Sequence, residues 1–289
     1  MGIPRGTARL LLDEARERPF SGRLLELGKM TVYVSAPELE RWAREQRTQL
    51  AVDPAPELSH VPALARLGCL SDRSFFRRLG FAEVESSDVS DWEGADRILD
   101  LNDPVPVQLH GRYDVVFEAG TIQHVFHQPR VFENVHALLA EGGRAIHGMA
   151  PSSNHVDHGF WMYSPTLFHD FYTANGWRVE ALYFFEFFPY WHRGRFHSAT
   201  WKVRRYEPGC LDHVAYGGFR GRQVGLFVVA TKLPGATADR VPQQSWFSRH
   251  AGDVAAAPAD GALPRPLKRW KKRLERLLPR RLPPVVARY

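Results

Sequence analysis

Short apolar segments and amphipathic helical segments alternate along most of this 289-residue chain. Hydrophobic periodicity predicts helices over residues 7–18, 37–50, 72–78, 129–140 and 165–175. Apolar runs of strand length predict strands over residues 22–28, 81–88, 97–101, 113–118, 144–149, 177–188 and 223–231. Strands that alternate with helices form βαβ units, which build a mostly parallel sheet with helices on both faces. No helix is evident between the last two strands, so we expect them to form an antiparallel hairpin at the sheet edge.

The composition divides the chain into one folded domain and a C-terminal region. We expect the domain to span residues 1–234. Beyond it the sequence is rich in Ala, Pro, Gly and Asp, which predicts a linker over residues 235–264. Residues 265–289 form a basic, proline-rich tail with ten Lys or Arg and one acid, Glu275. Within this tail, residues 267–278 have the spacing of a short amphipathic helix.

The positive charge of the chain lies almost entirely in this tail. The formal net charge is +6, and the chain without its tail is mildly acidic. Proteins that bind nucleic acid more often carry a basic patch on the domain itself, so the distribution disfavours a nucleic-acid partner. The basic amphipathic segment can lie on an anionic membrane surface or dock on a partner protein. The alternative is a solvated tail without a partner.

Targeting signals and cysteines also bound the class of protein. No run approaches the roughly 20 apolar residues of a membrane-spanning helix. Residues 1–12 lack the apolar run and cleavage site of a secretory signal. Cys69 and Cys210 are too few for a disulfide framework or a zinc site. We expect a cytoplasmic protein, with peripheral membrane contact through the tail as one possibility.

Acidic residues and glycines follow four of the predicted strands. In chain order they are Glu26 and Gly28, Asp88, Asp100 with Leu101, and Glu118 with Gly120. In an open parallel sheet, ligands bind outside the carboxyl ends of the strands, near the point where the strand order reverses. A carboxylate such as Asp88 can accept both hydroxyls of a ribose, and Asp100 can accept from an exocyclic amine. Gly28 and Gly120 let the backbone approach a ligand without a clashing Cβ.

Two segments carry a family resemblance. Residues 113–124 read YDVVFEAGTIQH and residues 138–146 read LLAEGGRAI. They resemble the fourth strand and the approach to the fifth strand of class I S-adenosylmethionine-dependent methyltransferases, over roughly residues 22–231. The resemblance implies a Rossmann-like methyltransferase fold, with a seven-stranded sheet whose last strand is antiparallel. It also implies S-adenosylmethionine as cofactor, touched by Glu26, Gly28, Asp88, Asp100, Leu101 and Glu118.

The chain departs from the family pattern in two places. The usual glycine-rich loop has three glycines, whereas here only Gly28 stands, and Met30 and Val32 occupy the later glycine positions. Side chains there would crowd a cofactor unless the loop runs differently. In addition, 60 residues separate Gly28 from Asp88, because the segment 37–69 is inserted. Both features indicate a divergent subgroup.

The acceptor side of the expected site is rich in histidine. His155 and His158 follow the fifth strand, and His124 follows the fourth, with His127 close behind it. A histidine with a pKa near neutrality is a natural base for methyl transfer to oxygen. We therefore take His124, His155 and His158 as candidate catalytic residues. Alternatives are that they hydrogen-bond loop backbone, or that His155 and His158 hold a divalent ion, although a third ligand at telling spacing is lacking.

An aromatic run over residues 183–191 suggests sheet core. Four residues beyond it, His192, Arg193, Arg195 and His197, are candidates for the wall of a pocket for an anionic or sugar-like acceptor.

The predicted function is transfer of the sulfonium methyl to a nucleophile, most simply a hydroxyl, of a small molecule or glycan. One competing class is a binding or scaffold protein that keeps the fold but not the activity. Another is a nicotinamide-dependent oxidoreductase, which the missing Gly-x-Gly-x-x-Gly pattern disfavours.

Overall fold

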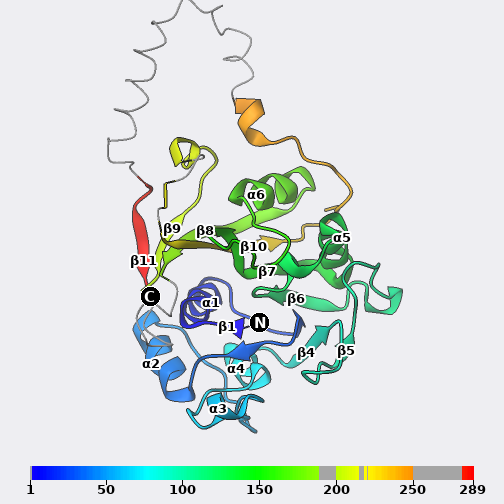
Figure 1. Cartoon of the computed structure of the whole chain (residues 1–289). Helices are drawn as coiled ribbons and strands as arrows, with labels where there is room; N and C mark the ends of the chain where they lie inside the picture. Colours follow the sequence, from blue (N-terminus) through cyan, green and yellow to red (C-terminus); the bar gives the residue numbers. More distant parts are fainter. Residues whose placement is uncertain (1, 189–199, 215–217, 220, 250–281) are drawn as a thin grey trace, which may run out of the picture.

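A computed structural model describes residues 2–188, 200–214, 218–219, 221–249 and 282–289 (Figure 1). Nine strands form the main sheet: β2 (Arg23–Leu27), β4 (Glu83–Asp88), β5 (Arg97–Ile98), β6 (Tyr113–Glu118), β7 (Leu139–Ser153), β8 (Arg178–Phe187), β9 (Lys202–Arg205), β10 (Gln223–Thr231) and β11 (Val285–Arg288). Their order across the sheet is β11-β9-β8-β10-β7-β6-β2-β4-β5. Two short strands, β1 (Gly2–Ile3) and β3 (Thr31–Val32), pair separately.

The directions of the strands divide the sheet into two parts. Strands β5, β4, β2, β6 and β7 are parallel to one another. Strand β10 runs antiparallel between β7 and β8. The predicted α/β fold, a parallel core with an antiparallel hairpin, is confirmed. Two further antiparallel strands, β9 and β11, extend the hairpin side of the sheet.

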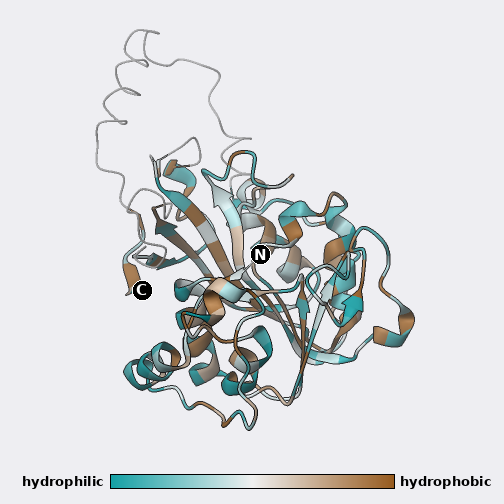
Figure 2. Ribbon diagram, turned by 60° about the horizontal axis from the view of Figure 1, so that its bottom comes forward, coloured by the Kyte–Doolittle hydropathy of each residue, from teal (hydrophilic) through white to brown (hydrophobic). Residues whose placement is uncertain are grey.

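Helices cover both faces of the sheet, as Figure 1 shows. On one face lie α1 (Arg5–Glu17), α2 (Ala36–Gln46) and α4 (Asp72–Leu79), with the short α3 (Pro62–Ala65) at the periphery. On the other lie α5 (Gln128–Leu138) and α6 (Pro165–Ala174). The apolar residues accordingly form two buried clusters, one beneath each helical layer. The apolar colours in Figure 2 concentrate on the central strands and on the helix faces that turn toward them.

The pairing of β3 with β1 explains where Met30 and Val32 lie. After Gly28 the chain enters β3 rather than a helix, and β3 pairs with β1 near the N-terminus. Met30 and Val32 are fully buried in the apolar cluster shared with α1 and α2.

Helix α4 then leads into β4. Its predicted start and end are confirmed, because Ser71 Oγ accepts from Ser74 N at 3.1 Å and Gly80 takes the left-handed conformation.

Helix α5 ends earlier than the sequence suggests. We expected it to reach residue 140 and the next strand to begin at residue 144, but β7 begins at Leu139. Gly142 and Gly143 therefore lie inside the strand, where the pairing of β6 with β7 shifts register between Tyr113 and Val115.

The described parts of the C-terminal region lie against the domain. Thr237 N donates to Asn175 O at 2.9 Å, and Ser245 N donates to Asp170 Oδ2 at 2.6 Å, so residues 237–245 pack against α6 and its C-terminal end. At the far end, Trp201 N donates to Tyr289 O at 2.7 Å, next to β11. The predicted tail helix over residues 267–278 lies outside the described residues, and the division at residues 234 and 264 stays a prediction. Among the described residues, no helix has the length and apolarity needed to span a bilayer.

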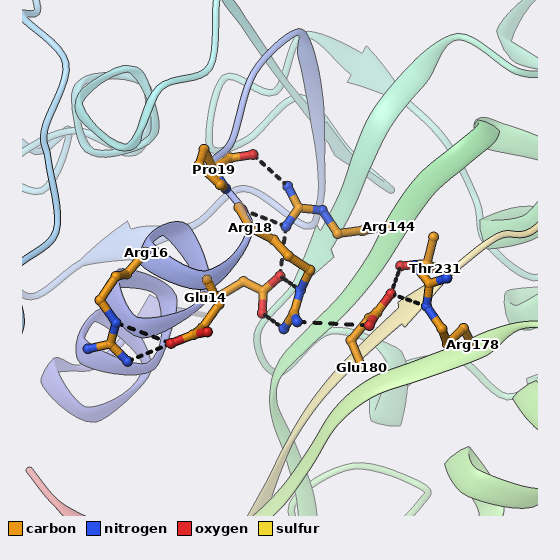
Figure 3. A network of polar contacts seen from close by, with 9 residues as sticks. Glu14, Arg16, Arg18, Pro19, Arg144, Arg178, Glu180 and Thr231 are labelled. Carbon is orange, nitrogen blue, oxygen red and sulfur yellow. Dashed lines mark hydrogen bonds and ion pairs between the residues drawn. The ribbon is translucent and has the colours of Figure 1, made fainter.

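A buried charge network holds α1 on the sheet (Figure 3). Glu14 is 3% exposed and pairs with Arg18 and with Arg144, whose Nη1 lies 2.7 Å from Glu14 Oε1. Arg144 also donates to the carbonyl oxygens of Arg18 and Pro19, at 2.9 and 3.2 Å. Burial lowers the pKa of Arg144, and Glu14 acts in the opposite direction. A buried cation of this kind depends on its carboxylate partner.

We therefore expect Glu14→Gln to lower the free energy of unfolding by about 3 kcal/mol, since it removes the carboxylate that pairs with the buried Arg144 guanidinium. Urea unfolding measures this. Glu17→Gln is the matched control, because the Glu17 side chain is 60% exposed beside Arg16. This substitution should lower the free energy of unfolding by less than about 0.5 kcal/mol. Equal losses in the two variants would contradict the role given to the network.

Candidate functional site

The candidate site lies at the carboxyl ends of the parallel strands. Strand β2 pairs with β4 on one side and with β6 on the other, so the strand order reverses at β2. Ligands of open α/β sheets bind at this kind of position. Thr121 Oγ donates to Leu27 O and so joins the segment after β6 to the end of β2.

Glu26 lies at the end of β2 and is fully buried. Its Oε2 accepts from Met30 N at 3.2 Å. Its Oε1 receives no hydrogen bond from the described residues. Burial, and after it the nearby Asp72 carboxylate, raises the pKa of Glu26 well above its usual value. A ligand with a cationic hydrogen-bond donor would satisfy Oε1 and favour the ionised carboxylate.

An ion pair fixes the segment that follows Gly28. Lys29 Nζ lies 2.5 Å from Asp72 Oδ2, and both side chains are buried. Asp72 is the first residue of α4, so the pair ties the end of β2 to the start of that helix. Lys29 N also donates to Asp88 Oδ2 at 3.1 Å. The part of the site expected to hold a methionine moiety is therefore built from charged groups rather than from a glycine-rich loop.

The predicted residues on β4 and β5 are more accessible. Asp88 is half-buried, and its Oδ1 accepts from Val89 N at 2.8 Å. Each carboxylate oxygen has two acceptor positions, so capacity for a ribose remains. Asp100 is exposed and accepts from Asn102 N at 2.8 Å, whereas Leu101 is buried. Gly28 adopts φ 84°, and its N donates to Ser87 O at 2.7 Å.

Glu118 is buried at the end of β6 and shapes the turn behind it. Its Oε2 accepts from Gly120 N and Thr121 N at 3.0 and 3.2 Å. Its Oε1 lies 3.1 Å from His147 Nδ1, and His147 Nε2 lies 2.7 Å from the Tyr172 hydroxyl. Sequence reasoning missed His147 and Tyr172, because each lies within a regular element and no spacing marks either one.

Gly120 leaves room above this turn. It adopts φ 92°, and an added Cβ would meet only Gln123 Nε2, at 3.5 Å. Together with the accessible Asp88 and Asp100, this opening suits the adenosine part of S-adenosylmethionine. The unsatisfied Glu26 Oε1 suits its amino group. The accessible groups near β4, β5 and Gly120 are of the kind that binds a nucleoside, whereas Glu26 is covered and is reached only if its surroundings open.

The three candidate catalytic histidines lie together. The His124 and His158 rings have centroids 5.4 Å apart, and the His155 and His158 rings 6.2 Å apart. His124 ends the short helical turn Ile122–His124, while His155 and His158 lie on the loop after β7. His127 instead caps α5, its Nδ1 accepting from Arg130 N at 3.3 Å. Among the described residues, no three or more His, Cys, Asp or Glu gather as they would around a metal ion.

The three imidazoles differ in exposure. His124 and His158 are exposed, whereas His155 is buried. Burial, and after it the neighbouring His158, lowers the pKa of both His124 and His155, that of His155 to about 4. A hydrogen bond with the Val224 backbone acts against this shift in His155. His155 Nε2 has no partner among the described residues. The predicted wall residues His192, Arg193, Arg195 and His197 lie outside the described residues.

The lowered pKa of His155 predicts a pH dependence of stability. The folded protein holds this ring neutral down to about pH 4, whereas the unfolded chain protonates it near its usual value of 6.5. The stability that the neutral His155 ring contributes is therefore complete above pH 6.5 and is lost as the pH falls toward 4. We expect its loss to lower the free energy of unfolding by up to about 3 kcal/mol between these two pH values.

Urea unfolding of His155→Gln over this pH range should show a shallower decline than the wild type. His60→Gln, at an exposed position, is the control and should leave the decline unchanged. An unaltered pH dependence in His155→Gln would contradict a buried neutral ring.

Comparison with known proteins finds similarity among solved structures only. Neither the protein-family models nor the curated protein sequences give a match. Among solved structures, a SAM-dependent methyltransferase from Archaeoglobus fulgidus is 11% identical with TM-score 0.39, covering 78% of this chain and 94% of that one. A possible histamine N-methyltransferase from Thermotoga maritima is 13% identical with TM-score 0.34, covering 78% and 90%. A T. thermophilus 16S rRNA methyltransferase in complex with AdoMet and guanosine is 14% identical with TM-score 0.32, covering 83% and 42%.

Because these TM-scores are low, the fold assignment rests on the sheet itself. The five parallel strands and the antiparallel β10 between β7 and β8 are those of the methyltransferase fold. The chain has the Rossmann-like fold of S-adenosylmethionine-dependent methyltransferases.

Proposed function

We propose that this protein transfers a methyl group from S-adenosylmethionine to a hydroxyl of a small molecule or glycan. One observation carries the proposal. The same edge of the sheet presents accessible carboxylates at the ends of β4 and β5 and a cluster of three histidines beyond β6 and β7. The first group suits a nucleoside, and the second suits a proton transfer beside it.

Asp88 would hold the ribose of the cofactor, and Asp100 with Leu101 would hold the adenine. Gly28 and Gly120 would let the backbone approach, with Glu118 setting the turn at Gly120. Glu26 would take the amino group at its unsatisfied oxygen. When bound, S-adenosylmethionine would supply an electrophilic methyl group.

The histidines act on the acceptor in this proposal. As a hydroxyl oxygen takes up a methyl group, its proton must leave, and a neutral imidazole can accept it. His124 and His158 are exposed and can reach a bound hydroxyl, whereas the buried His155 supports the loop that carries His158. Most of the rate enhancement would come from alignment of the acceptor.

A non-catalytic binding protein is the alternative, and the buried Glu26 is the observation that favours it. If the Lys29–Asp72 ion pair keeps that end of the site closed, the fold serves as a scaffold. The basic tail, with its predicted contact to a membrane surface or a partner protein, is compatible with either function.

Calorimetric titration with S-adenosylhomocysteine tests the cofactor site. We expect micromolar binding that Asp88→Ala weakens tenfold or more, about 1.4 kcal/mol, because the ribose loses its acceptor. Asp91→Ala, an exposed carboxylate just past the same strand, is the control and should retain wild-type affinity. Failure of folded wild-type protein to bind would replace this proposal by the scaffold function.

The pH profile tests the base. His124 has a pKa lowered from 6.5 by burial and by His158, so it stays neutral to a lower pH than an ordinary histidine. We therefore expect kcat/KM to decline at acidic pH, with the midpoint of that decline below pH 6.5. His124→Ala should lower kcat about 100-fold or more and remove that decline. An unchanged decline at acidic pH in His124→Ala would assign the proton transfer to another group.

A further inference from the structure

The two loops that carry the exposed histidines lie against each other. Phe160 N donates to Gln123 O at 2.8 Å. Gly159 adopts φ 94°, and a Cβ there would meet Gln123 Cγ at 2.8 Å and Gln123 O at 2.9 Å. Only glycine allows this approach, so residues 121–127 and 154–163 form one joined surface.

Three aromatic side chains on this surface are exposed. Phe126 is 67% exposed, Phe160 66% and Trp161 39%. The Phe126 and Phe160 rings meet edge to face with centroids 5.6 Å apart, and Phe126 and Trp161 lie 6.4 Å apart. We call these three residues the aromatic platform. A contiguous exposed apolar patch of this kind can mark a binding site.

The aromatic platform and the histidine pair lie on the same two joined loops. Phe126 follows His124 by two residues, and Phe160 follows His158 by two residues. The two histidine rings meet edge to face, as the two phenylalanine rings do. A ligand on the platform would therefore lie on the same joined surface as the imidazoles.

The charge of the two loops limits what this ligand can be. Residues 121–127 and 154–163 contain no Lys or Arg, and their one acid is Asp157. The nearest cation along the chain, Arg130, is paired with Glu133. Arg222, whose carbonyl accepts from Asn154, is paired with Glu186. An anionic ligand would find no counter-charge on these loops.

We propose that the aromatic platform binds the acceptor, and that the acceptor is a neutral, flat aromatic compound with a hydroxyl group, in the class of the phenols. Phe126 and Phe160 stand at 90° to each other, so a flat apolar body can stack on one ring while its edge meets the other. The histidine pair on the same loops would accept the proton of the acceptor's hydroxyl group. This inference rests on the proposed methyl transfer, which it narrows from any hydroxyl compound to one class.

The test uses 2-naphthol and its anionic analogue 2-naphthoate, which share one ring system. Each is titrated calorimetrically into the full chain at neutral pH, with and without S-adenosylhomocysteine. We expect 2-naphthol to bind at least tenfold more tightly than 2-naphthoate. The double variant Phe126→Ser, Phe160→Ser should weaken 2-naphthol at least tenfold and leave the affinity for S-adenosylhomocysteine unchanged. Phe247→Ser is the matched control, at an exposed phenylalanine of the C-terminal region. It should change neither the 2-naphthol affinity nor the S-adenosylhomocysteine affinity.

Several results would overturn the inference: no binding of 2-naphthol in either condition, equal binding of the two probes, or unchanged 2-naphthol binding in the double variant. The titrations also separate this inference from the proposed function. Binding of S-adenosylhomocysteine without binding of 2-naphthol would refute the platform alone. Binding of 2-naphthol through the platform without any binding of S-adenosylhomocysteine would refute the cofactor and leave the platform as a ligand site.

Discussion

The pairing of β2 with two parallel neighbours is the constraint on which the site depends. Backbone groups of β2 bond to β4 on one side and to β6 on the other, and buried backbone groups cannot be left unpaired without a large cost. This position forces the chain to reverse the strand order at β2 and brings Glu26, Asp88 and Glu118 to one edge. The charge network of Glu14, Arg18 and Arg144 fixes α1 on the sheet near the start of β7, which leaves the carboxyl edge free for ligands.

The two halves of that edge differ in their polar chemistry. Around β2 the carboxyl of Glu26 and the Lys29–Asp72 pair are buried, so any ligand must displace part of a closed polar cluster. Around β4 and β5 the carboxylates remain accessible. Behind β6, the chain from Glu118 through His147 to Tyr172 satisfies each buried polar group in turn. A satisfied buried network is rigid, and this one holds the turn at Gly120 from below. In the function we propose, binding of the cofactor would therefore begin with its adenosine part, near β4 and β5.

Much of this arrangement was predictable from local patterns. Continuous apolar runs of strand length located β6, β8 and β10, and Ser71 and Gly80 marked both ends of α4. From the sequence, His155 with His158 and His124 with His127 are predicted as two separate sets, and the structure brings His124, His155 and His158 together. The roles of the predicted cofactor residues stay predictions. Other features were out of reach: β9 and β11 are too short to carry a pattern, and the burial of Met30 depends on pairing with β1, which is remote in sequence. Neither spacing nor composition marks His147 as a partner of Glu118, because that contact joins residues 29 apart.

The central claim is that the carboxyl edge of the sheet binds S-adenosylmethionine. Amide hydrogen–deuterium exchange of the full chain, with and without S-adenosylhomocysteine, tests it directly because protection maps the site residue by residue. We expect slower exchange over residues 26–30, 86–91, 99–103 and 118–124, and no change over residues 40–56, which run from within α2 into the loop after it. Unchanged exchange at the strand ends, or protection confined to the α2 side of the molecule, would contradict it.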